Sequence, residues 1–298
     1  MEKLDIKLIG RKVRKLREES GLTREQFCKT NINISVKQLM RIEQGKCMPT
    51  VATLHMISKC LEIPLSILLG EQHVPTSYYN LKYQLIKTRT FCEKILIEQK
   101  RMLIDEIYSK YCEILPESEL LTLDIIERIL DYIELDDSPT VKDLFGDDFS
   151  DILTKEKITI NDLLLINYYV IQCYFSGYSL EEFEKYYNLL LNYDVFEDEL
   201  CNIQFVYILV GILYIYDREY RYNKDMTRLI EKINELIEKN KFFEIKPIIL
   251  IMEAKYYLFS NKDKKKAAEK YEHASILLKE FGESIFINRI NLKDFLNS

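Results

Sequence analysis

Two basic side chains, Lys37 and Arg41, stand four residues apart in a short segment of the chain. On a helix, residues at this spacing lie one turn apart on the same side, so the two cations would form one positive face. Such a face can bind the phosphates or the base edges of DNA, although most paired charges on helices are only a solvated surface. The other flank of the segment is apolar and suits a core, with Val36, Leu39 and Ile42.

The ends of this segment carry signals that start and stop a helix. Ser35 is a favourable N-cap, and Gln38 stands three residues on, where its side chain would complete a capping box. Gly45 stands where a residue in the left-handed conformation commonly ends a helix. We therefore predict a short helix over residues 35–43.

A second capped helix precedes the first. Gly21 favours a turn, and Thr23 and Gln26 have the spacing of another capping box. Two short capped helices in succession predict a helix-turn-helix, here with a connection over residues 29–34 that is longer than the tightest turns of this motif. Three further helices complete the predicted core, over residues 5–19, 50–61 and 64–69.

This part of the chain resembles the phage-repressor-like (XRE or Cro/C1-type) helix-turn-helix. The resemblance rests on Ile9, Gly10, Arg11, Leu16, Arg17, Gly21, Leu22, Thr23, Ile42, Glu43, Gln44, Gly45, Pro49 and Leu54. In such domains the second helix of the motif lies in the major groove, and the first helps to seat the protein on the DNA backbone. The resemblance implies base or phosphate contacts for Ser35, Lys37, Gln38 and Arg41, and phosphate contacts for Thr23, Arg24 and Lys46.

The net charge of −6 is distributed unevenly along the chain. Residues 1–70 hold 13 Lys and Arg against 7 Asp and Glu, which leaves 29 against 41 for the rest. A basic N-terminal part can bind phosphates, whereas an acidic body is repelled by them. The asymmetry therefore indicates two parts with different roles.

The composition favours neither an enzyme nor a secreted or membrane protein. The seven cysteines include no Cys-x-x-Cys pair, and no signal segment precedes them, which predicts reduced thiols in the cytoplasm. The longest apolar runs, such as residues 205–215, are shorter than the roughly 20 residues of a membrane span. His55, His73 and His273 lie far apart, and no catalytic or metal-binding motif surrounds them. We expect no catalysis, no cofactor and no metal.

Beyond a linker over residues 71–77, the chain reads as a succession of amphipathic helices. These are expected near residues 78–88, 94–113, 117–132, 139–153, 159–175, 179–192, 197–217, 223–239, 243–259, 264–280 and 283–296. Ala267, Tyr271 and Ala274 have the spacing of the second helix of a tetratricopeptide repeat (TPR), and Ala254 and Leu258 fit the helix before it. We predict an all-α fold, with a helix-turn-helix domain over residues 1–70 and a degenerate TPR-like α-solenoid over residues 78–298.

This order of parts resembles the Rgg-type regulators of Gram-positive bacteria, which belong to a wider group that senses imported peptides, and it is most similar to the ComR branch. The segments that carry the resemblance are residues 78–79, 85–87, 114–117, 119–125, 161–164, 254–256 and 266–269. The resemblance implies a quorum-sensing activator of competence genes that binds a short hydrophobic signalling peptide on its repeats. It also implies that the bound form pairs into a homodimer on a palindromic site in double-stranded promoter DNA. The apolar helix over residues 283–296 is a candidate for exchange between the two partners.

For the peptide site we expect amides that bind the peptide backbone, aromatic residues that receive its apolar side chains, and a lysine that binds its free carboxylate. The candidates are Thr90, Lys100, Asn167, Asn202 and Lys246. The resemblance to the ComR pattern adds support only for Thr90 and Lys100. Most of the tyrosines, including Tyr168, Tyr169 and Tyr174, are expected to pack in the core.

Two alternatives share every one of these motifs. A related regulator of bacteriocin genes would differ only in its promoter and peptide, and a regulator whose repeats bind a protein would lack the peptide altogether.

The charge split, together with the resemblance, also suggests a hypothesis for the state that does not bind DNA. In this hypothesis Lys37 and Arg41 pair with Glu117 and Glu119 when no peptide is bound. Charge reversal at both carboxylates tests the hypothesis, and the measurement is DNA binding without peptide.

Overall fold

The computed structural model describes residues 6–29, 34–63, 65, 68, 74–90, 93–135 and 138–281. The chain divides into two compact units, one formed by Met1–Tyr79 with Lys110–Pro116 and the other by Asn80–Ser109 with Glu117–Ser298. The first unit includes the short segment near residue 111 because Tyr111 packs edge-on against the buried Tyr78 at 5.9 Å. Its hydroxyl also donates a hydrogen bond of 2.7 Å to Ser77.

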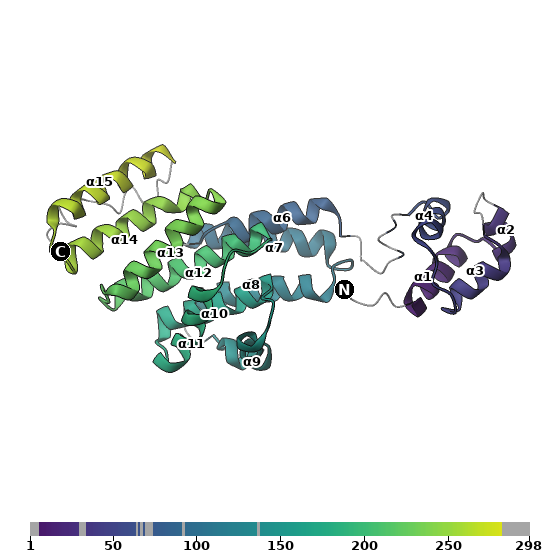
Figure 1. Cartoon of the computed structure of the whole chain (residues 1–298), viewed down its shortest axis with the longest axis horizontal. Coiled ribbons are helices and arrows are strands. Elements are labelled where there is room, and N and C mark those ends of the chain that lie inside the picture. The colour runs from purple at the N-terminus through teal and green to yellow at the C-terminus, as the bar shows by residue number, and fades with distance from the viewer. Residues whose placement is uncertain are drawn as a thin grey trace. The chain divides into compact units, whose positions relative to one another are not determined.

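The first unit is built from the predicted helix-turn-helix elements, α1 (Ile6–Glu19), α2 (Arg24–Lys29), α3 (Val36–Glu43) and α4 (Val51–Cys60) (Figure 1). Of the helix predicted over residues 64–69, Leu65 and Leu68 are described and helical, and the other residues lie outside the described part of the chain. The apolar stripes of these helices meet in one core, which contains Ile9, Val13, Phe27, Ile34, Leu39, Leu54, Ile57 and Leu68.

Two glycines allow α1 and α3 to approach closely. A Cβ atom at Gly10 would lie 2.3 Å from the carbonyl oxygen of Ile42, so only glycine fits at this crossing. Gly45 has a φ of +64° and ends α3 in a Schellman motif, in which Lys46 N–H donates to the Arg41 carbonyl at 2.9 Å. The predicted stop at Gly45 is therefore confirmed.

The second unit is a succession of helices whose predicted positions are confirmed to within a few residues. They are α6 (Thr76–Lys87), which begins in the first unit, α7 (Lys94–Tyr111), α8 (Glu117–Glu134), α9 (Val141–Asp151), α10 (Ile160–Ser176), α11 (Leu180–Asn192), α12 (Glu199–Arg218), α13 (Lys224–Asn240), α14 (Lys246–Phe259) and α15 (Lys264–Glu280). Short 3₁₀ turns, Ile152–Thr154 and Phe243–Ile245, adjoin α9 and α14. The predicted helix over residues 283–296 lies outside the described residues.

Side chains of the N-cap residues start several of these helices where the sequence changes from polar to apolar. Thr140 and Thr159 each form a complete capping box, with Asp143 and Asp162 respectively. Asp198 caps α12 by accepting hydrogen bonds from the N–H groups of Leu200 and Cys201. These caps pair backbone donors that no helical carbonyl can reach, which fixes where each helix begins.

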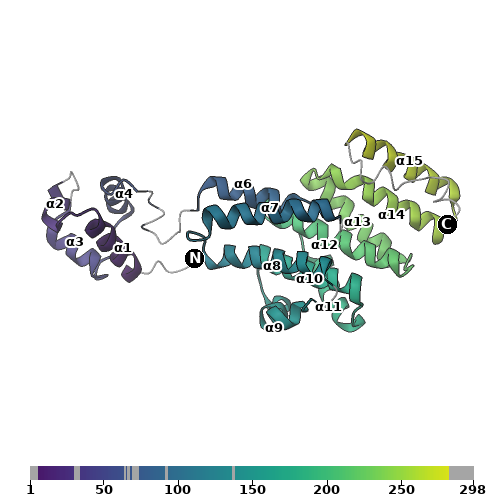
Figure 2. The same cartoon turned by 180° about the vertical axis from the view of Figure 1, so that it is seen from behind.

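Most helices of the second unit pack in a succession that follows the chain, although α8, α10 and α12 pack on one another directly. In the second unit α10 packs between α8 and α12, α12 against α13, α13 against α14, and α14 against α15 (Figures 1 and 2). The TPR-like hairpin is confirmed, because Ala254 on α14 and Ala267 on α15 are completely buried in one cluster with Leu258 and Tyr271. Small residues at these positions allow the two helices to pack closely.

A long apolar helix, α12, forms the centre of this unit. It is long and apolar enough to span a membrane by composition, but 72% of its apolar window is buried inside the structure. Fully buried residues on it include Phe205, Val206, Ile208 and Leu209. A helix that is apolar on all sides is typical of the interior of a large domain, and α12 is such a core helix.

The close crossing of α1 and α3 makes a specific prediction. Gly10→Ala should destabilise the first unit by about 1 to 3 kcal/mol, because the added methyl group overlaps backbone atoms that cannot move independently. Gly146→Ala in α9 is the matched control, since nothing lies within 4 Å of its Cβ position. Hydrogen exchange of the amides in α1 and α3 measures the effect. Unchanged protection in Gly10→Ala would contradict the close-approach explanation.

Candidate DNA-binding face and ligand cavity

Helix α3 presents the predicted basic face to solvent. The side chains of Lys37, Gln38 and Arg41 are exposed, as is that of Lys46 beyond the helix. Within the described part of the chain, none of these four side chains has a hydrogen-bond or ion-pair partner. Leu39 and Ile42 on the other flank are completely buried. Burial of this apolar flank holds the helix so that its cations and amide remain available for a ligand.

The two predicted hydroxyl contacts act as helix caps. Ser35 Oγ accepts the Gln38 N–H at 3.2 Å and so caps α3, as predicted. Thr23 and Gln26 form the complete reciprocal capping box of α2, with hydrogen bonds of 2.8 and 3.2 Å. Each hydroxyl uses only an acceptor site in its cap, so its own proton is still available for a phosphate oxygen.

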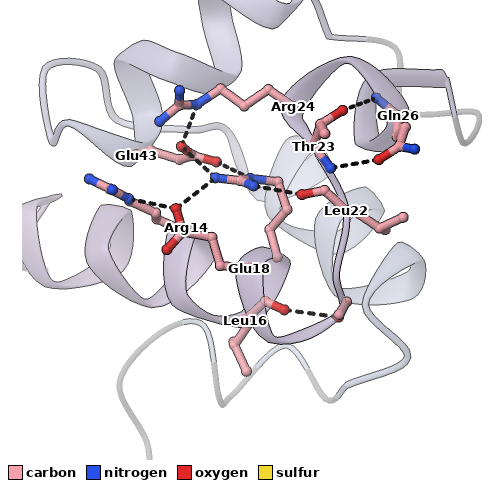
Figure 3. A network of polar contacts seen from close by, with 10 residues as sticks. Arg14, Leu16, Glu18, Leu22, Thr23, Arg24, Gln26 and Glu43 are labelled. Atoms are coloured by element: carbon pink, nitrogen blue, oxygen red, sulfur yellow. Dashed lines mark hydrogen bonds and ion pairs between the residues drawn. The ribbon is translucent and has the colours of Figure 1, made fainter.

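A buried carboxylate ties the three helices of the helix-turn-helix together (Figure 3). Glu43 on α3 accepts hydrogen bonds of 2.7 Å from Arg17 Nε on α1 and from Arg24 Nε on α2. The Arg17 and Glu43 side chains are 6% and 1% exposed, and the hydrogen bond that Arg17 donates to Glu43 raises the pKa of Arg17. Arg17 also donates to the Leu22 carbonyl at the start of the turn. The carboxylate therefore fixes the angle between the helices.

This network gives Arg24 a structural role beside the predicted phosphate contact. Its side chain is 33% exposed and its Nε is bonded to Glu43, so its position depends on the ion pair. From the sequence, Arg24 was predicted only as a phosphate contact. Its position at the first residue of α2 did not show that it would reach a carboxylate 19 residues away.

The second unit contains a cavity of about 980 Å³, a volume that includes its open mouth. Its lining comes from α6, α7, α8, α10, α12, α14, the loop after α6 and the 3₁₀ turn before α14. Most of the lining is aliphatic, namely Ile86, Ile126, Ile129, Leu130, Ile133, Leu164, Ile171, Val210, Ile245 and Ile248. The other lining residues are Thr88, Arg89, Thr90, Lys100, Asn167, Gln204, Tyr207, Gly211 and Tyr214. An apolar cavity with a few polar groups suits an organic ligand that is largely hydrophobic.

Three of these polar groups have no partner within the described residues. The Lys100 ammonium and the amide of Asn167 make no hydrogen bond or ion pair there, and Gln204 Nε2 is buried without an acceptor. Desolvation in the cavity lowers the pKa of Lys100 to about 8. A desolvated cation surrounded by aliphatic side chains strongly favours a ligand with a negative charge.

The loop after α6 is held over this cavity by contacts to later helices. Tyr207 on α12 donates a hydrogen bond of 2.8 Å to the carbonyl of Lys87. Arg89 Nη1 donates one of 3.4 Å to the carbonyl of Glu244, and Lys87 lies 3.8 Å from the carboxylate of the same residue. These contacts fix Thr88, Arg89 and Thr90 at the cavity wall.

The structure brings three of the five predicted peptide contacts together and places two elsewhere. Thr90, Lys100 and Asn167 line the cavity, whereas Asn202 and Lys246 are not among its lining residues. Asn202 is buried and binds both the N–H and the carbonyl of Phe196, and Lys246 Nζ binds Asn234 at 2.7 Å. These partners give both side chains a structural role.

The sequence reasoning missed Gln204, Arg89 and Tyr207. Gln204 stands next to the apolar run that begins at Phe205, and a polar residue within a buried helix was the one signal that marked it. Nothing in the local sequence distinguished Tyr207 from the other tyrosines.

One of the two carboxylates that were expected to hold the basic face has a partner within its own unit. Glu119 on α8 accepts a hydrogen bond of 2.6 Å from Lys82 on α6, and this lysine is only 6% exposed. Glu117 is exposed at the start of α8. Of the two, Glu117 is thus the one whose charge can be reversed without breaking this internal ion pair.

The first unit is a helix-turn-helix with an exposed basic helix, and the second is a TPR-like unit with a ligand cavity. These two units define the class of transcriptional regulators that carry a DNA-binding domain and a sensor domain on one chain. The family described as ComR tetratricopeptide matches residues 75–293. The chain is 33% identical to ComR from S. thermophilus, solved with DNA and its signalling peptide ComS, over 97% of this chain and 98% of that one, with a TM-score of 0.72. The chain belongs to the ComR family.

Two further structures agree with this assignment. ComR from Streptococcus vestibularis, in complex with its cognate signalling peptide XIP, is 34% identical over 95% of this chain and 96% of that one, with a TM-score of 0.71. PlcR from Bacillus thuringiensis, at 15% identity over 94% of this chain and 99% of that one and a TM-score of 0.52, shares the fold. The comparison with curated protein sequences gives no match.

The buried carboxylate makes a prediction about the first unit. Glu43→Gln should destabilise this unit by about 3 to 5 kcal/mol, because it removes the buried counter-charge of Arg17 and leaves only the half-exposed Glu18. Glu18→Gln is the matched control, since Glu18 also contacts Arg17 but is half exposed, and it should change little. Protection of the α1 and α3 amides from hydrogen exchange measures both. Equal losses in the two variants would show that the burial of Glu43 does not matter.

Proposed function

We propose that this protein is a cytoplasmic, non-enzymatic transcriptional regulator that binds a short hydrophobic peptide in its second unit and promoter DNA with α3. The observation that carries the proposal is the unpaired, desolvated ammonium of Lys100 in an aliphatic cavity. A peptide with a free C-terminal carboxylate supplies the missing charge and also supplies apolar side chains. The ComR relatives solved with the peptides ComS and XIP support this choice of ligand.

In the proposed complex, the carboxylate of the peptide binds Lys100, and Thr90 beside the cavity donates to it or to the last amide. Asn167 on α10 binds the peptide backbone, since an amide side chain matches both the N–H and the carbonyl of a peptide unit. The isoleucines and leucines of α8 and α10 receive its apolar side chains. Asn202 and Lys246 are the weaker candidates for peptide contacts, because their side chains already bind other residues of the protein.

On the DNA side, α3 lies in the major groove of the proposed complex. Lys37, Gln38 and Arg41 contact bases or phosphates, while Ser35, Thr23, Arg24 and Lys46 contact the backbone. ComR from S. thermophilus was solved in complex with DNA, which supports DNA as the partner of this unit. Binding as a homodimer to a palindromic site follows from the usual match between two-fold protein and DNA symmetry. Activation of competence genes is the regulatory output that we propose.

A peptide controls DNA binding in this scheme only through a difference in affinity between two states of the protein. The peptide must bind the DNA-competent state more tightly, and DNA must then favour peptide binding by the same factor, typically about 5- to 150-fold. We propose that Glu117 contributes to the state that does not bind DNA, by pairing with Lys37 or Arg41. The internal bond of Glu119 to Lys82 makes Glu119 the weaker candidate for this role.

The proposed function predicts DNA binding that depends on a peptide. Fluorescence anisotropy of purified protein on a pool of palindromic promoter fragments should show tighter binding when a library of short hydrophobic peptides is added. Arg41→Ala should weaken that binding by about 1 to 3 kcal/mol. Lys59→Ala on α4 is the control, because it removes the same charge from an exposed position off α3. Binding that no peptide changes would contradict the sensor role, and equal losses in both variants would contradict groove reading by α3.

Lys100 predicts a pH dependence of peptide affinity. Its pKa is about 8 in the empty cavity and rises when a carboxylate binds, so affinity should be constant below pH 8 and fall above it by up to tenfold per pH unit. The probe is an N-acetylated octapeptide with a free carboxylate, selected from a random library at pH 7. Lys100→Arg should bind without this pH dependence, because arginine stays charged. The same fall in affinity in Lys100→Arg would assign the titration to another group.

A further inference from the structure

Gln204 on α12 is a buried amide that the fold leaves unpaired. Its side chain is 3% exposed, and its Nε2 group has no hydrogen-bond partner among the described residues. It also lines the ligand cavity. A buried donor without an acceptor is unfavourable, because the group has lost its water and gained nothing in return. Such a group in a cavity wall indicates a position where a ligand supplies the acceptor.

A second buried glutamine shows that this fold can pair such amides. Gln172 on α10 is 7% exposed, and its Oε1 accepts the N–H of Val141 at 3.0 Å. That bond satisfies the first backbone donor of α9 and has no relation to the cavity. Of these two glutamines, Gln204 is thus the one with a buried amide nitrogen that has no partner among the described residues, and Gln172 serves as its control.

Helix α12, which carries Gln204, cannot easily shift to bring the unpaired amide to a hydrogen-bond acceptor. A Cβ at Gly211 would lie 2.9 Å from Cγ1 of Val170, so α12 and α10 already pack as closely as a glycine allows. Tyr207, one turn after Gln204, is bonded to the Lys87 carbonyl. Gln204, Tyr207, Gly211 and Tyr214 share the helix face that lines the cavity, and Gln204 carries the one carboxamide on that face.

We infer that Gln204 donates a hydrogen bond from Nε2 to a backbone carbonyl of the bound peptide and that this bond is needed for tight binding. The inference rests on the proposed peptide ligand. A backbone carbonyl is the acceptor that every residue of a peptide presents, so the contact selects a peptide main chain at that depth whatever its side chains. Gln204 on α12 and Asn167 on the adjacent α10 then hold the main chain from two sides, while Lys100 holds its carboxylate.

The binding test uses octapeptides with a free carboxylate, selected by affinity from a random library on the wild-type full chain. Gln204→Leu, which keeps the approximate volume, should raise the Kd of the selected peptides at least tenfold. Gln172→Leu should leave that Kd within about threefold, since Gln172 does not line the cavity. Peptides in which one carbonyl at a time is a thiocarbonyl, a weaker acceptor, should identify one position that weakens binding to the wild type but not to Gln204→Leu.

A second measurement needs no peptide. Without a ligand, Gln204→Leu should leave the apparent Tm unchanged or raise it by about 2 to 4 °C, because the variant removes an unpaired buried donor. Gln172→Leu should lower the apparent Tm, because it strands the N–H of Val141.

The outcomes separate the inference from the proposed function. If the wild type retains no peptide from the library, both are wrong. If peptides bind and Gln204→Leu has the wild-type Kd, the proposed function stands and the inference about Gln204 is overturned. A fall in the apparent Tm of Gln204→Leu as large as that of Gln172→Leu would also overturn it, since Gln204 would then have a structural partner.

Discussion

The structure depends on how it compensates charged groups that are withdrawn from water, and its two units do so in opposite ways. In the first unit the buried carboxylate of Glu43 is neutralised by Arg17 and Arg24, so the helix-turn-helix is complete without a ligand. In the second unit the ammonium of Lys100 is desolvated and has no counter-ion within the described residues. A buried charge that the fold leaves uncompensated is costly, and the cost is removed when a partner of opposite charge binds.

The helices around the cavity explain how such a site can persist in an empty protein. An aliphatic cavity would tend to collapse if its walls could move together. Here α12 is fixed against α10 by close packing at Gly211 and Val170, and against the loop after α6 by the bond from Tyr207. Side-chain caps at Thr159 and Asp198 fix the starts of the two central helices. Rigid walls preserve both the volume and the unpaired polar groups.

Prediction from the sequence succeeded where the signals are local. Apolar periodicity and caps such as Ser35, Thr23 and Thr159 depend on residues within one or two turns, and the helices that they mark are present. The ion pair of Arg24 and the hydrogen bonds of Asn202 and Lys246 depend on partners that lie 19, 6 and 12 residues away, and no local signal marked these contacts. A partly buried lysine such as Lys100 was found only through resemblance, because desolvation is a property of the assembled helices.

The uncompensated charge of Lys100 also explains how peptide binding can favour one conformation of this protein. Much of the free energy that a carboxylate gains at Lys100 comes from relief of a desolvation cost that the empty protein already carries. That relief is available only if the cavity stays closed around the ammonium, since a lysine in water gains little from an ion pair. A conformation in which the loop over residues 88–90 left the cavity would hydrate Lys100 and lower the affinity for the peptide. The ligand therefore stabilises the closed arrangement of α6, α7 and α12, and any surface of the protein that exists only in that arrangement becomes coupled to the peptide.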